Sequence, residues 1–377
     1  MRCDIIIPVW NQPAHTRTCI ENLARNTRYP YRLILVDNGS EAETGDYIKA
    51  LAIDGVEKLV IRNELNLGFV KAVNQGLKCS NAPYVCVLNN DTIPAPGWLE
   101  RLVEFAESHE DVGLMNPVCG GHGDIPVEEY ARKLEANKGR YMEMNQCFGF
   151  CMLIRRELID KIGYLDEAFG IGGFDDTDYS MRAHKAGYRS VCVHSSYVYH
   201  KQHASFNAMG DRRALVAPGE QAYFRKWPRH LRVGVSFYAD GSGDREIENL
   251  LKDMLFLARE WCWVNLWIFG DKAGSRARIE AASRKIEMPL HQNIKFNYFP
   301  KRFGDAQSAI RLIERSFGTK SRKRYDVVLA GNDRTLSVLN ALYPLHRTRI
   351  RRIGFEHDAV KELASMISGL RDQKHER

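Results

Sequence analysis

Residues 1–90 alternate between short apolar runs and longer amphipathic segments. The apolar runs are rich in Ile and Val, and they read CDIIIPVW, YRLILVDNGS, EKLVIRN and YVCVLNND. Such runs predict strands that are covered on both faces. Between them we expect helices: one opens at Pro13, one starts with a capping box of Ser40 and Glu43, and one covers about Phe69 to Cys79. The pattern predicts a mostly parallel sheet with helices on both faces.

A second α/β series begins near Leu231. Its apolar runs are RVGVSFYAD, VNLWIFGD, IKFNYF, YDVVLAG and RIRRIGF, and helical segments separate them. The segment YFRKWPRHL, which contains Pro228, breaks the pattern between the two series. We therefore expect two α/β domains, residues 1–229 and a smaller, Rossmann-like domain of residues 230–377.

The composition is that of a globular protein with two cores. The chain has 377 residues, of which 44% are hydrophobic and 27% are charged. No apolar run approaches the ~20 residues of a membrane helix, and the first strand begins at Cys3, which argues against a signal peptide. The nine cysteines lack paired metal spacing and fit core thiols in a reducing compartment. We expect a cytoplasmic protein, with peripheral contact to the inner face of the membrane as an option.

The net charge of +7 is spread unevenly, because basic residues gather late in the chain in KRFGD, TKSRKRYD and HRTRIRRIG. Such clusters attract polyanions or an anionic membrane surface. A solvated basic face is the alternative.

Small polar and acidic residues follow the predicted strands of the first series. They are Asn11 after the first strand, Asp37 to Ser40 after the second, Asn63 to Gly68 after the third, and Asn89 to Asp91 after the fourth. In parallel sheets, ligands bind beyond the carboxyl ends of the strands. Amides, a carboxylate and glycines at one sheet edge suit a nucleotide.

The stretch GGFDDTDYSMRAHKAGY places Asp175, Asp176 and Asp178 within four positions, directly before a predicted helix. One or two carboxylates would be enough to cap the helix and complement its dipole. Three like charges in this place also indicate an active site.

Five motifs, IIIPVWNQ, ILVDNGS, NLGFVKAVNQG, VLNNDT and FDDTDYSMRAHKAGY, resemble in order and spacing those of family-2-type inverting glycosyltransferases of the GT-A fold, of the rhamnosyl- and galactofuranosyl-type. The resemblance covers about residues 3–229. It implies a nucleotide-diphosphate sugar donor (UDP, dTDP or GDP), a Mg²⁺ or Mn²⁺ cofactor, and a hydroxyl acceptor on a glycan or a lipid-linked molecule.

The resemblance also assigns roles. Asp176 is implied as the general base that takes the proton of the acceptor hydroxyl. Asp91 is implied as the metal ligand, because VLNND has Asn89 where the usual motif has its first aspartate; His200, or else His203, is implied to complete the metal site. The residues implied to line the nucleotide sugar are Pro8, Asn11, Asp37, Asn38, Asn66, Gly68, Asn74, Asn89 and Asn90.

Several alternatives stay open. Trp98 can stack on an acceptor sugar or anchor the following helix. Asp175 and Asp178 belong to the acceptor side or to the loop. Three rival functions remain: transfer to a polyanionic acceptor such as DNA, a non-catalytic nucleotide-sugar-binding scaffold, and a sugar-phosphate nucleotidyltransferase. Against the last, this sequence has PVWNQPAH where nucleotidyltransferases usually have a Gly-rich loop.

The second domain resembles one lobe of type I periplasmic-binding and repressor-like sensor domains, with Asn332 and Asp333 as the pair that meets a ligand. It can hold the acceptor, form a homodimer or support the first domain.

Overall fold

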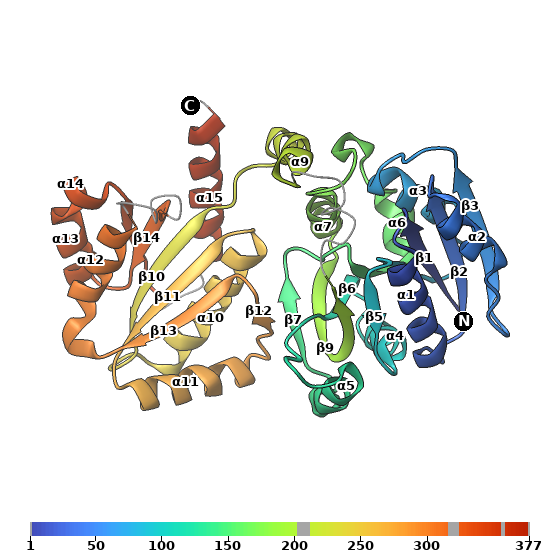
Figure 1. Ribbon diagram of the computed structural model, residues 1–377. Coiled ribbons are helices and arrows are strands. Elements are labelled where there is room, and N and C mark those ends of the chain that lie inside the picture. The colour runs from blue at the N-terminus through green and yellow to red at the C-terminus, as the bar shows by residue number, and fades with distance from the viewer. Residues whose placement is uncertain (1, 202–211, 316–323, 356–358, 376–377) are drawn as a thin grey trace. The chain divides into compact units, whose positions relative to one another are not determined.

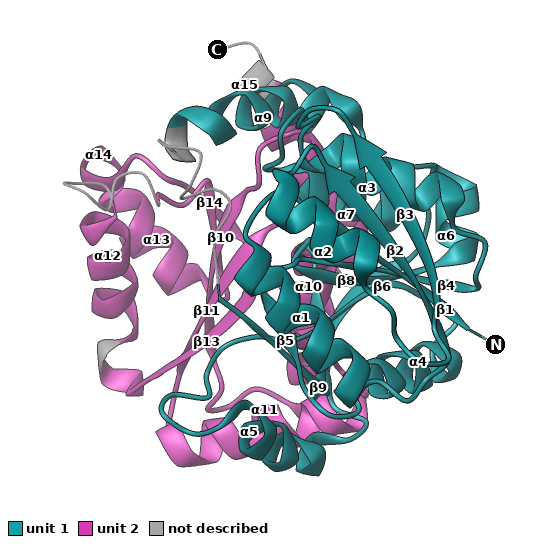
Figure 2. Ribbon diagram, turned by 45° about the vertical axis from the view of Figure 1, so that its right-hand side comes forward, with its two compact units in different colours: residues 1–227 teal, residues 228–377 magenta. Residues whose placement is uncertain are grey.

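The computed structural model describes residues 2–201, 212–315, 324–355 and 359–375. The chain divides into two compact units, Met1–Trp227 and Pro228–Arg377, which Figure 2 colours teal and magenta. Both units are α/β, as the sequence predicts.

The first unit opens with the four predicted strands, all paired in parallel (Figure 1). β1 (Cys3–Val9) lies between β2 (Tyr31–Asn38) and β4 (Tyr84–Leu88), and β3 (Glu57–Asn63) pairs with β2. Helices α1 (Pro13–Asn26), α2 (Ala42–Ala50) and α3 (Phe69–Cys79) connect them. The carboxyl ends of these strands therefore meet at one edge.

Helices cover both faces of these strands. Ile5 and Ile7 share a buried cluster with Ile20 of α1, whereas Ile6 points to the other face. There, Gly76 of α3 lies so close to Ile6 that a Cβ added to this glycine would stand 2.4 Å from Ile6 Cγ2. The strands are buried on both sides, which explains why their sequences show almost no polar alternation.

Antiparallel strands extend the sheet. In spatial order the strands of the first unit are β7, β9, β6, β8, β4, β1, β2 and β3, and β5 pairs with β9. The β4–β8, β6–β8, β7–β9 and β5–β9 pairs are antiparallel, and β6–β9 is parallel. The elements are β5 (Thr92–Pro94), α4 (Trp98–Ser108), β6 (Val112–Val118), α5 (Val127–Leu134), η1 (Glu135–Asn137), β7 (Tyr141–Met144), β8 (Cys151–Arg155), α6 (Arg156–Ile162), η2 (Glu167–Phe169), α7 (Asp175–Lys185), β9 (Arg189–His200) and α9 (Arg212–Lys226).

The second unit has a parallel sheet in the order β13, β11, β10, β14, β15. This is the strand order of a Rossmann-type sheet. The direction in which successive strands are added to the sheet reverses between β10 and β14, while the strands themselves stay parallel. The elements are β10 (Arg232–Tyr238), α10 (Asp244–Arg259), β11 (Trp263–Phe269), α11 (Lys272–Lys285), β12 (Leu290–His291), β13 (Ile294–Phe299), η3 (Lys301–Phe303), α12 (Gly304–Glu314), β14 (Val327–Ala330), α13 (Asp333–Ala341), α14 (Tyr343–His346), β15 (Arg349–Arg352) and α15 (Val360–His375).

The predicted capping box at Ser40 is wrong. Helix α2 starts one residue later than predicted, with Glu41 as its N-cap, and has no side-chain cap. The Ser40 hydroxyl instead accepts the backbone N–H of Asn11 at 2.9 Å.

Among the described helices, none is both long and apolar enough to cross a membrane.

Candidate active site

The loops after β1 and β2 are tied together by Asn11. Its backbone N–H donates to Ser40 Oγ at 2.9 Å, and its Oδ1 accepts the N–H of Glu41 at 2.8 Å. Asn11 and Gln12 both have positive φ angles, 53° and 59°. Two consecutive non-glycine residues in this region are uncommon, and such strain gathers at functional sites.

Asp37 ends β2 as a buried, paired carboxylate. Its Oδ1 accepts the N–H of Ser40 at 3.0 Å, and its Oδ2 forms an ion pair with Arg62, its register partner on β3. The Arg62 side chain is 50% exposed, whereas that of Asp37 is 2% exposed. A ligand at this strand end therefore reaches Arg62 before Asp37.

Asn38 joins β2 to the loop after β3. Its Nδ2 donates to Asn66 Oδ1 at 2.8 Å and to the Gly68 carbonyl at 3.2 Å, and its Oδ1 accepts the N–H of Leu67 and the Asn63 amide at 3.0 Å each. Asn66 Oδ1 also accepts the N–H of Gly68 at 2.9 Å. These bonds give the asparagine-rich loop a fixed shape.

Gly68 brings this loop against the glycine-rich segment that precedes α7. Its φ is 86°, and an added Cβ would lie 2.9 Å from Ile171 Cα. The next residue, Phe69, donates its N–H to the Ile171 carbonyl at 3.3 Å. Only glycine allows both the backbone conformation and this approach.

The polar end of β4 lies beside the end of β9. β5 pairs with β9 so that Thr92 is opposite His200, and this places His200 Nε2 3.2 Å from Asp91 Oδ1. Asn90 donates from Nδ2 to Thr16 Oγ1 at 3.0 Å. Asn89 Oδ1 is buried and accepts no hydrogen bond within the described part of the chain.

Asp176, in the first turn of α7, holds its carboxylate between several donors. Oδ1 accepts the N–H of Thr177 at 2.7 Å and Gln146 Nε2 at 3.2 Å, and Oδ2 accepts the N–H of Gly149 at 3.1 Å. Burial raises the pKa of Asp176, and these donors oppose the rise without cancelling it. The sequence could not give the sign of this shift; in the structure the shift is upward, and burial is its largest cause.

The two neighbouring aspartates are buried and have internal partners. Asp175 Oδ1 accepts the N–H of Gly173 at 2.7 Å, and burial together with the charge of Asp176 raises the pKa of Asp175 to about 7. Asp178 is fully buried and contacts Arg182 Nε at 2.9 Å, Lys226 Nζ at 2.8 Å and Trp227 Nε1 at 2.7 Å. Asp178 therefore attaches the end of α9 to α7 and presents no surface to an acceptor.

The segment of residues 145–150, NQCFGF, connects the two acidic centres. Gly149 donates to Asp176, while the next residue, Phe150, accepts the N–H of Asn89 at 2.8 Å through its carbonyl. The Phe150 ring also stacks on the His200 ring, with centroids 5.1 Å apart. Adjacent Cα atoms are about 3.8 Å apart, so Asp176 and the Asp91–His200 pair meet one dipeptide. The two acidic centres therefore lie near each other in the first unit.

The same segment presents an aromatic ring. Phe148 is 45% exposed, although Asn116 fixes its backbone on both sides: Asn116 Oδ1 accepts the Phe148 N–H at 2.7 Å, and Asn116 Nδ2 donates to the Phe148 carbonyl at 2.9 Å. The exposed ring thus stands on a fixed backbone next to Gly149, which contacts Asp176.

The Asp91–His200 pair fits a divalent cation. A carboxylate and an imidazole within 3.2 Å of each other are suitable donors, and the buried Oδ1 of Asn89 lies two residues from Asp91. Among the described residues no group of three His, Cys, Asp or Glu side chains could hold a metal. Such a two-residue site suits an ion that takes its other ligands from water and substrate phosphates.

Two predicted residues, Trp98 and Asn74, lie outside this arrangement. The acceptor role of Trp98 is wrong, since its ring has no exposed surface and its Nε1 donates to Thr27 Oγ1 at 2.9 Å; Trp98 is the helix anchor. Asn74 is 3% exposed, and its side-chain amide bonds to both the backbone N–H and the carbonyl of Leu165. Asn74 therefore positions the segment around Leu165. Pro8 is part of β1, past the last residue paired with β4. His203 lies outside the described residues.

The sequence reasoning missed Gln146, Gly149, Phe150 and Arg62. Three of them act through contacts made by the NQCFGF segment, whose glycine between two aromatic residues is the one available signal. Arg62 could have been found from its place opposite Asp37 at the end of the next parallel strand.

Residues 4–163 match the family model described as "Glycosyl transferase family 2". The chain is 22% identical over 293 residues to the "Putative glycosyltransferase EpsH" of Bacillus subtilis, an alignment that covers 73% of this chain and 79% of the relative. It is 24% identical over 238 residues to the "PGL/p-HBAD biosynthesis glycosyltransferase" of Mycobacterium tuberculosis, covering 61% and 86%. The "Uncharacterized protein y4gI" of Sinorhizobium fredii is 25% identical over 285 residues, and the alignment spans 68% of this chain but 30% of that protein.

Solved structures that a structural comparison matches to this chain include the mannosyltransferase PcManGT from Pyrobaculum calidifontis in complex with GDP-Man and Mn²⁺. It has a TM-score of 0.47 and 16% identity, and the match covers 85% of this chain and 82% of the other. S. aureus TarS 1–349 in complex with UDP-GlcNAc has a TM-score of 0.45 and 16% identity, covering 57% and 64%.

The raised pKa of Asp175 predicts how Asp175→Asn changes stability with pH. The unfolded pKa is near 3.9 and the folded pKa is about 7, so the stability that comes from protonated Asp175 is complete below about pH 4 and is lost as the pH rises through 7. Asparagine keeps the Oδ1 acceptor for Gly173 but carries no charge.

We expect Asp175→Asn to raise the free energy of unfolding at pH 8 by on the order of 1–3 kcal/mol and to change it little at pH 4, as measured by urea denaturation. Asp160→Asn, at an exposed carboxylate of α6, is the control and should have no effect at either pH. An equal change at both pH values would contradict the buried-charge explanation.

Proposed function

Because residues 4–163 match the family 2 glycosyltransferase model, we propose that this chain transfers a sugar from a nucleotide-diphosphate sugar to a hydroxyl group of an acceptor, with inversion at the anomeric carbon. Asp176 is the general base. Asp91 and His200 hold a Mg²⁺ or Mn²⁺ ion at the diphosphate.

One observation carries this proposal: Gly149 and Phe150 contact the two acidic centres from adjacent positions. An inverting displacement needs a base on one side of the anomeric carbon and a group that stabilises the leaving diphosphate on the other side. Two centres in separate cavities could not act on one substrate. Their shared dipeptide supports a single reaction site.

The contacts of Asp176 suit proton removal. Its Oδ2 accepts one N–H, from Gly149, and so keeps the capacity to accept the acceptor hydroxyl. The donors on Oδ1 fix the orientation of the carboxylate, and burial raises its pKa. A base whose pKa lies closer to the working pH takes up a proton more effectively.

The donor is proposed to lie along the carboxyl ends of β1 to β4. The loops there supply Asn11, Asn38 with Asn66, Gly68, and the exposed guanidinium of Arg62, which Asp37 holds in place. Asn89 and Asn90 belong to the same edge. A divalent cation bound at Asp91 and His200 would neutralise negative charge on the diphosphate.

The acceptor is proposed to approach over Phe148. The ring is exposed and stands next to Gly149, whose N–H holds the proposed base. Sugar rings pack well on aromatic faces, and Asn116 holds the backbone of Phe148, so that this backbone needs no further ordering on binding.

The finer assignments are proposals of the same kind. The donor carries UDP, dTDP or GDP and a hexosyl or deoxyhexosyl group, and the acceptor is a glycan or a lipid-linked intermediate. The cytoplasmic location, a homodimer and the role of the second unit stay predictions.

The assignment of the base predicts that Asp176→Asn abolishes transfer while the donor still binds. We expect a fall in kcat of about 10²–10⁴-fold, the usual contribution of a general base. Stabilisation by nucleoside diphosphate with Mn²⁺, measured as a thermal shift, should stay near the wild-type value. Asparagine must turn its NH₂ group toward a donor, so Asp176→Ala serves as a second variant.

Asp160→Asn is the matched control for Asp176 and should transfer sugar at the wild-type rate. Normal turnover by Asp176→Asn would end the assignment of the base. A wild-type chain that releases no nucleotide with any donor and acceptor would favour the scaffold alternative.

The metal site predicts that Asp91→Asn and His200→Phe weaken the Mn²⁺-dependent part of nucleotide binding. Phenylalanine keeps the stack on Phe150 but offers no ligand. We expect the Mn²⁺ concentration for half-maximal thermal shift to rise about 10–100-fold in each variant. Shifts measured in EDTA should equal those of the wild type, and an unchanged Mn²⁺ response in both variants would place the ion elsewhere.

The proposed acceptor platform predicts that Phe148→Ala raises KM for the acceptor about two- to tenfold, corresponding to ~0.5–1.5 kcal/mol of stacking energy. KM for the donor should not change, and Phe148→Tyr should restore the acceptor KM. The control is Tyr164→Ala, at another exposed aromatic residue of the first unit. A rise in donor KM alone would show that the ring serves the nucleotide sugar instead.

A further inference from the structure

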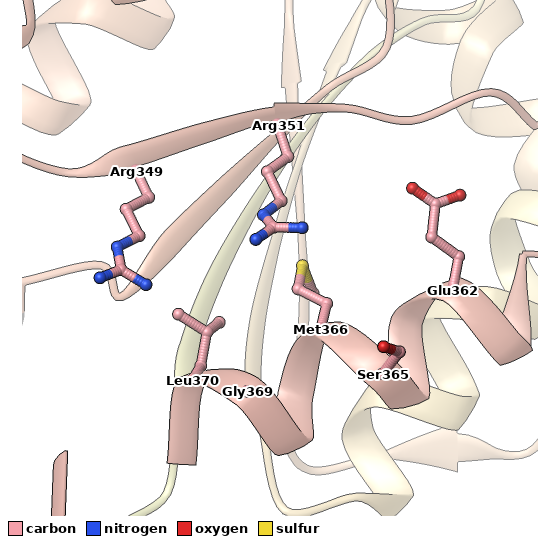
Figure 3. Close-up of a pocket in the computed structure, with 7 residues that line it drawn as sticks. All are labelled: Arg349, Arg351, Glu362, Ser365, Met366, Gly369 and Leu370. Carbon is pink, nitrogen blue, oxygen red and sulfur yellow. The ribbon is translucent and has the colours of Figure 1, made fainter. Parts of the chain in front are cut away.

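A cavity in the second unit lies between the strand β15 and the helix α15. It has a volume of about 260 Å³, and Figure 3 shows the residues that line it: Arg349, Arg351, Glu362, Ser365, Met366, Gly369 and Leu370. We call it the β15–α15 pocket. It is separate in sequence from every residue assigned to the reaction.

Strand alternation creates the basic wall of this pocket. Arg349 and Arg351 are two positions apart on β15 and therefore lie on the same face, and both side chains extend toward α15 (Figure 3). Ile350, between them, faces the opposite side and packs against a different apolar cluster. β15 pairs with β14 and ends the sheet, so its arginines stay accessible.

The helix supplies a floor and a hydroxyl group. Met366 and Leu370 are buried against the sheet, and they close the bottom of the pocket. Glu362, Ser365 and Gly369 form a row along the helix at spacings of three and four residues, which places them on one face. No atom lies within 4 Å of a Cβ added to Gly369, so its missing side chain leaves open space.

The guanidinium groups of Arg349 and Arg351 are available to a ligand. Arg352, next to them, is paired with Asp333 at 3.0 Å, and Arg324 donates to the His346 carbonyl. Within the described residues, by contrast, no hydrogen bond or ion pair is found for the guanidinium groups of Arg349 and Arg351. With Glu362 as the one carboxylate of the lining, two positive charges and one negative charge leave a net charge of +1.

We propose that the β15–α15 pocket binds a phosphate or diphosphate group, which accepts hydrogen bonds from the guanidinium forks of Arg349 and Arg351 and from the Ser365 hydroxyl. Two forks and a hydroxyl match an anion with three or more oxygens better than a carboxylate with two. The volume is below the ~300 Å³ of ordinary small-molecule sites, which suits a compact anion better than a whole nucleotide.

Glu362 restricts the chemical class of the ligand further. A carboxylate at one end of the pocket repels a long polyanion that runs along the helix but tolerates a compact anion whose attached group carries hydroxyls or an amine. The phosphate can belong to a soluble molecule or to a lipid headgroup, since both present the same oxygens. The proposal is independent of the reaction proposed for the first unit.

The test is calorimetric titration of the full chain with inorganic pyrophosphate, in EDTA and at constant ionic strength. We expect the wild-type chain to bind pyrophosphate. The affinity should fall at least about tenfold in the double variant Arg349→Gln with Arg351→Gln, and it should change less than about twofold in Arg347→Gln. Arg347 is exposed and lies in the same basic stretch but outside the pocket, so it controls for net charge.

A second variant, Gly369→Leu, fills the pocket without changing its charge and should lose binding to the same degree. The absence of wild-type binding, or an equal loss in Arg347→Gln, would overturn the proposal. Sedimentation with phosphatidylcholine vesicles, with and without phosphatidylglycerol, identifies the source. If the chain sediments only with vesicles that contain phosphatidylglycerol, and only with both arginines present, the ligand is a lipid headgroup. If the chain binds pyrophosphate but does not sediment with these vesicles, the ligand is a soluble phosphate.

Discussion

The dipeptide Gly149–Phe150 is the constraint on which the candidate site depends. The Gly149 N–H holds Asp176, the Phe150 carbonyl holds the end of β4 at Asn89, and the Phe150 ring holds His200 beside Asp91. The Cα atoms of two adjacent residues are about 3.8 Å apart. The distance between the two acidic centres is therefore limited by one dipeptide and by the contacts to it. The pairing of β5 with β9 adds the second constraint, because it places His200 beside Asp91.

Charge in the acidic cluster is distributed by partners. Asp178 keeps its negative charge compensated by Arg182 and Lys226, and this fastens α9 to α7. Asp175 has one backbone donor and a charged neighbour, and its pKa rises to about 7, so near neutral pH it is partly protonated. Burial also raises the pKa of Asp176, and hydrogen bonds to both of its oxygens fix its orientation. A partly protonated Asp175 repels a negative charge on Asp176 less than a fully ionised Asp175 would. The cluster thus contains one carboxylate that is paired within the fold, one that is partly protonated near neutral pH, and one, Asp176, that burial makes more basic.

Local patterns explain how much the sequence predicts. The first four strands follow from apolar runs, and the polar residues at their ends follow from parallel topology, as with Asn11, Asn38 and Asn66. The fate of Trp98 could not be decided, because its burial depends on a contact with Thr27, 71 positions away. The pairing of β5 with β9 is equally remote, and the family resemblance, not the residue pattern, pointed to His200. Gly149 and Phe150 act through backbone atoms that every residue has, so side-chain chemistry gave no signal for them.

The second unit shows the limit of the rule that ligands bind at the carboxyl ends of parallel strands. Asn332 and Asp333 stand at such an end, yet the Asn332 side chain caps α13 by accepting the Thr335 N–H at 2.8 Å, and Asp333 pairs with Arg352. These groups satisfy the fold itself. On the edge strand β15, by contrast, Arg349 and Arg351 face a helix whose carboxylate in the pocket lining, Glu362, forms no ion pair with either arginine among the described residues. Because unpaired charge beside a cavity is stabilised by a bound counter-charge, the sheet edge offers a ligand charge that the strand-end residues Asn332 and Asp333 already use within the fold.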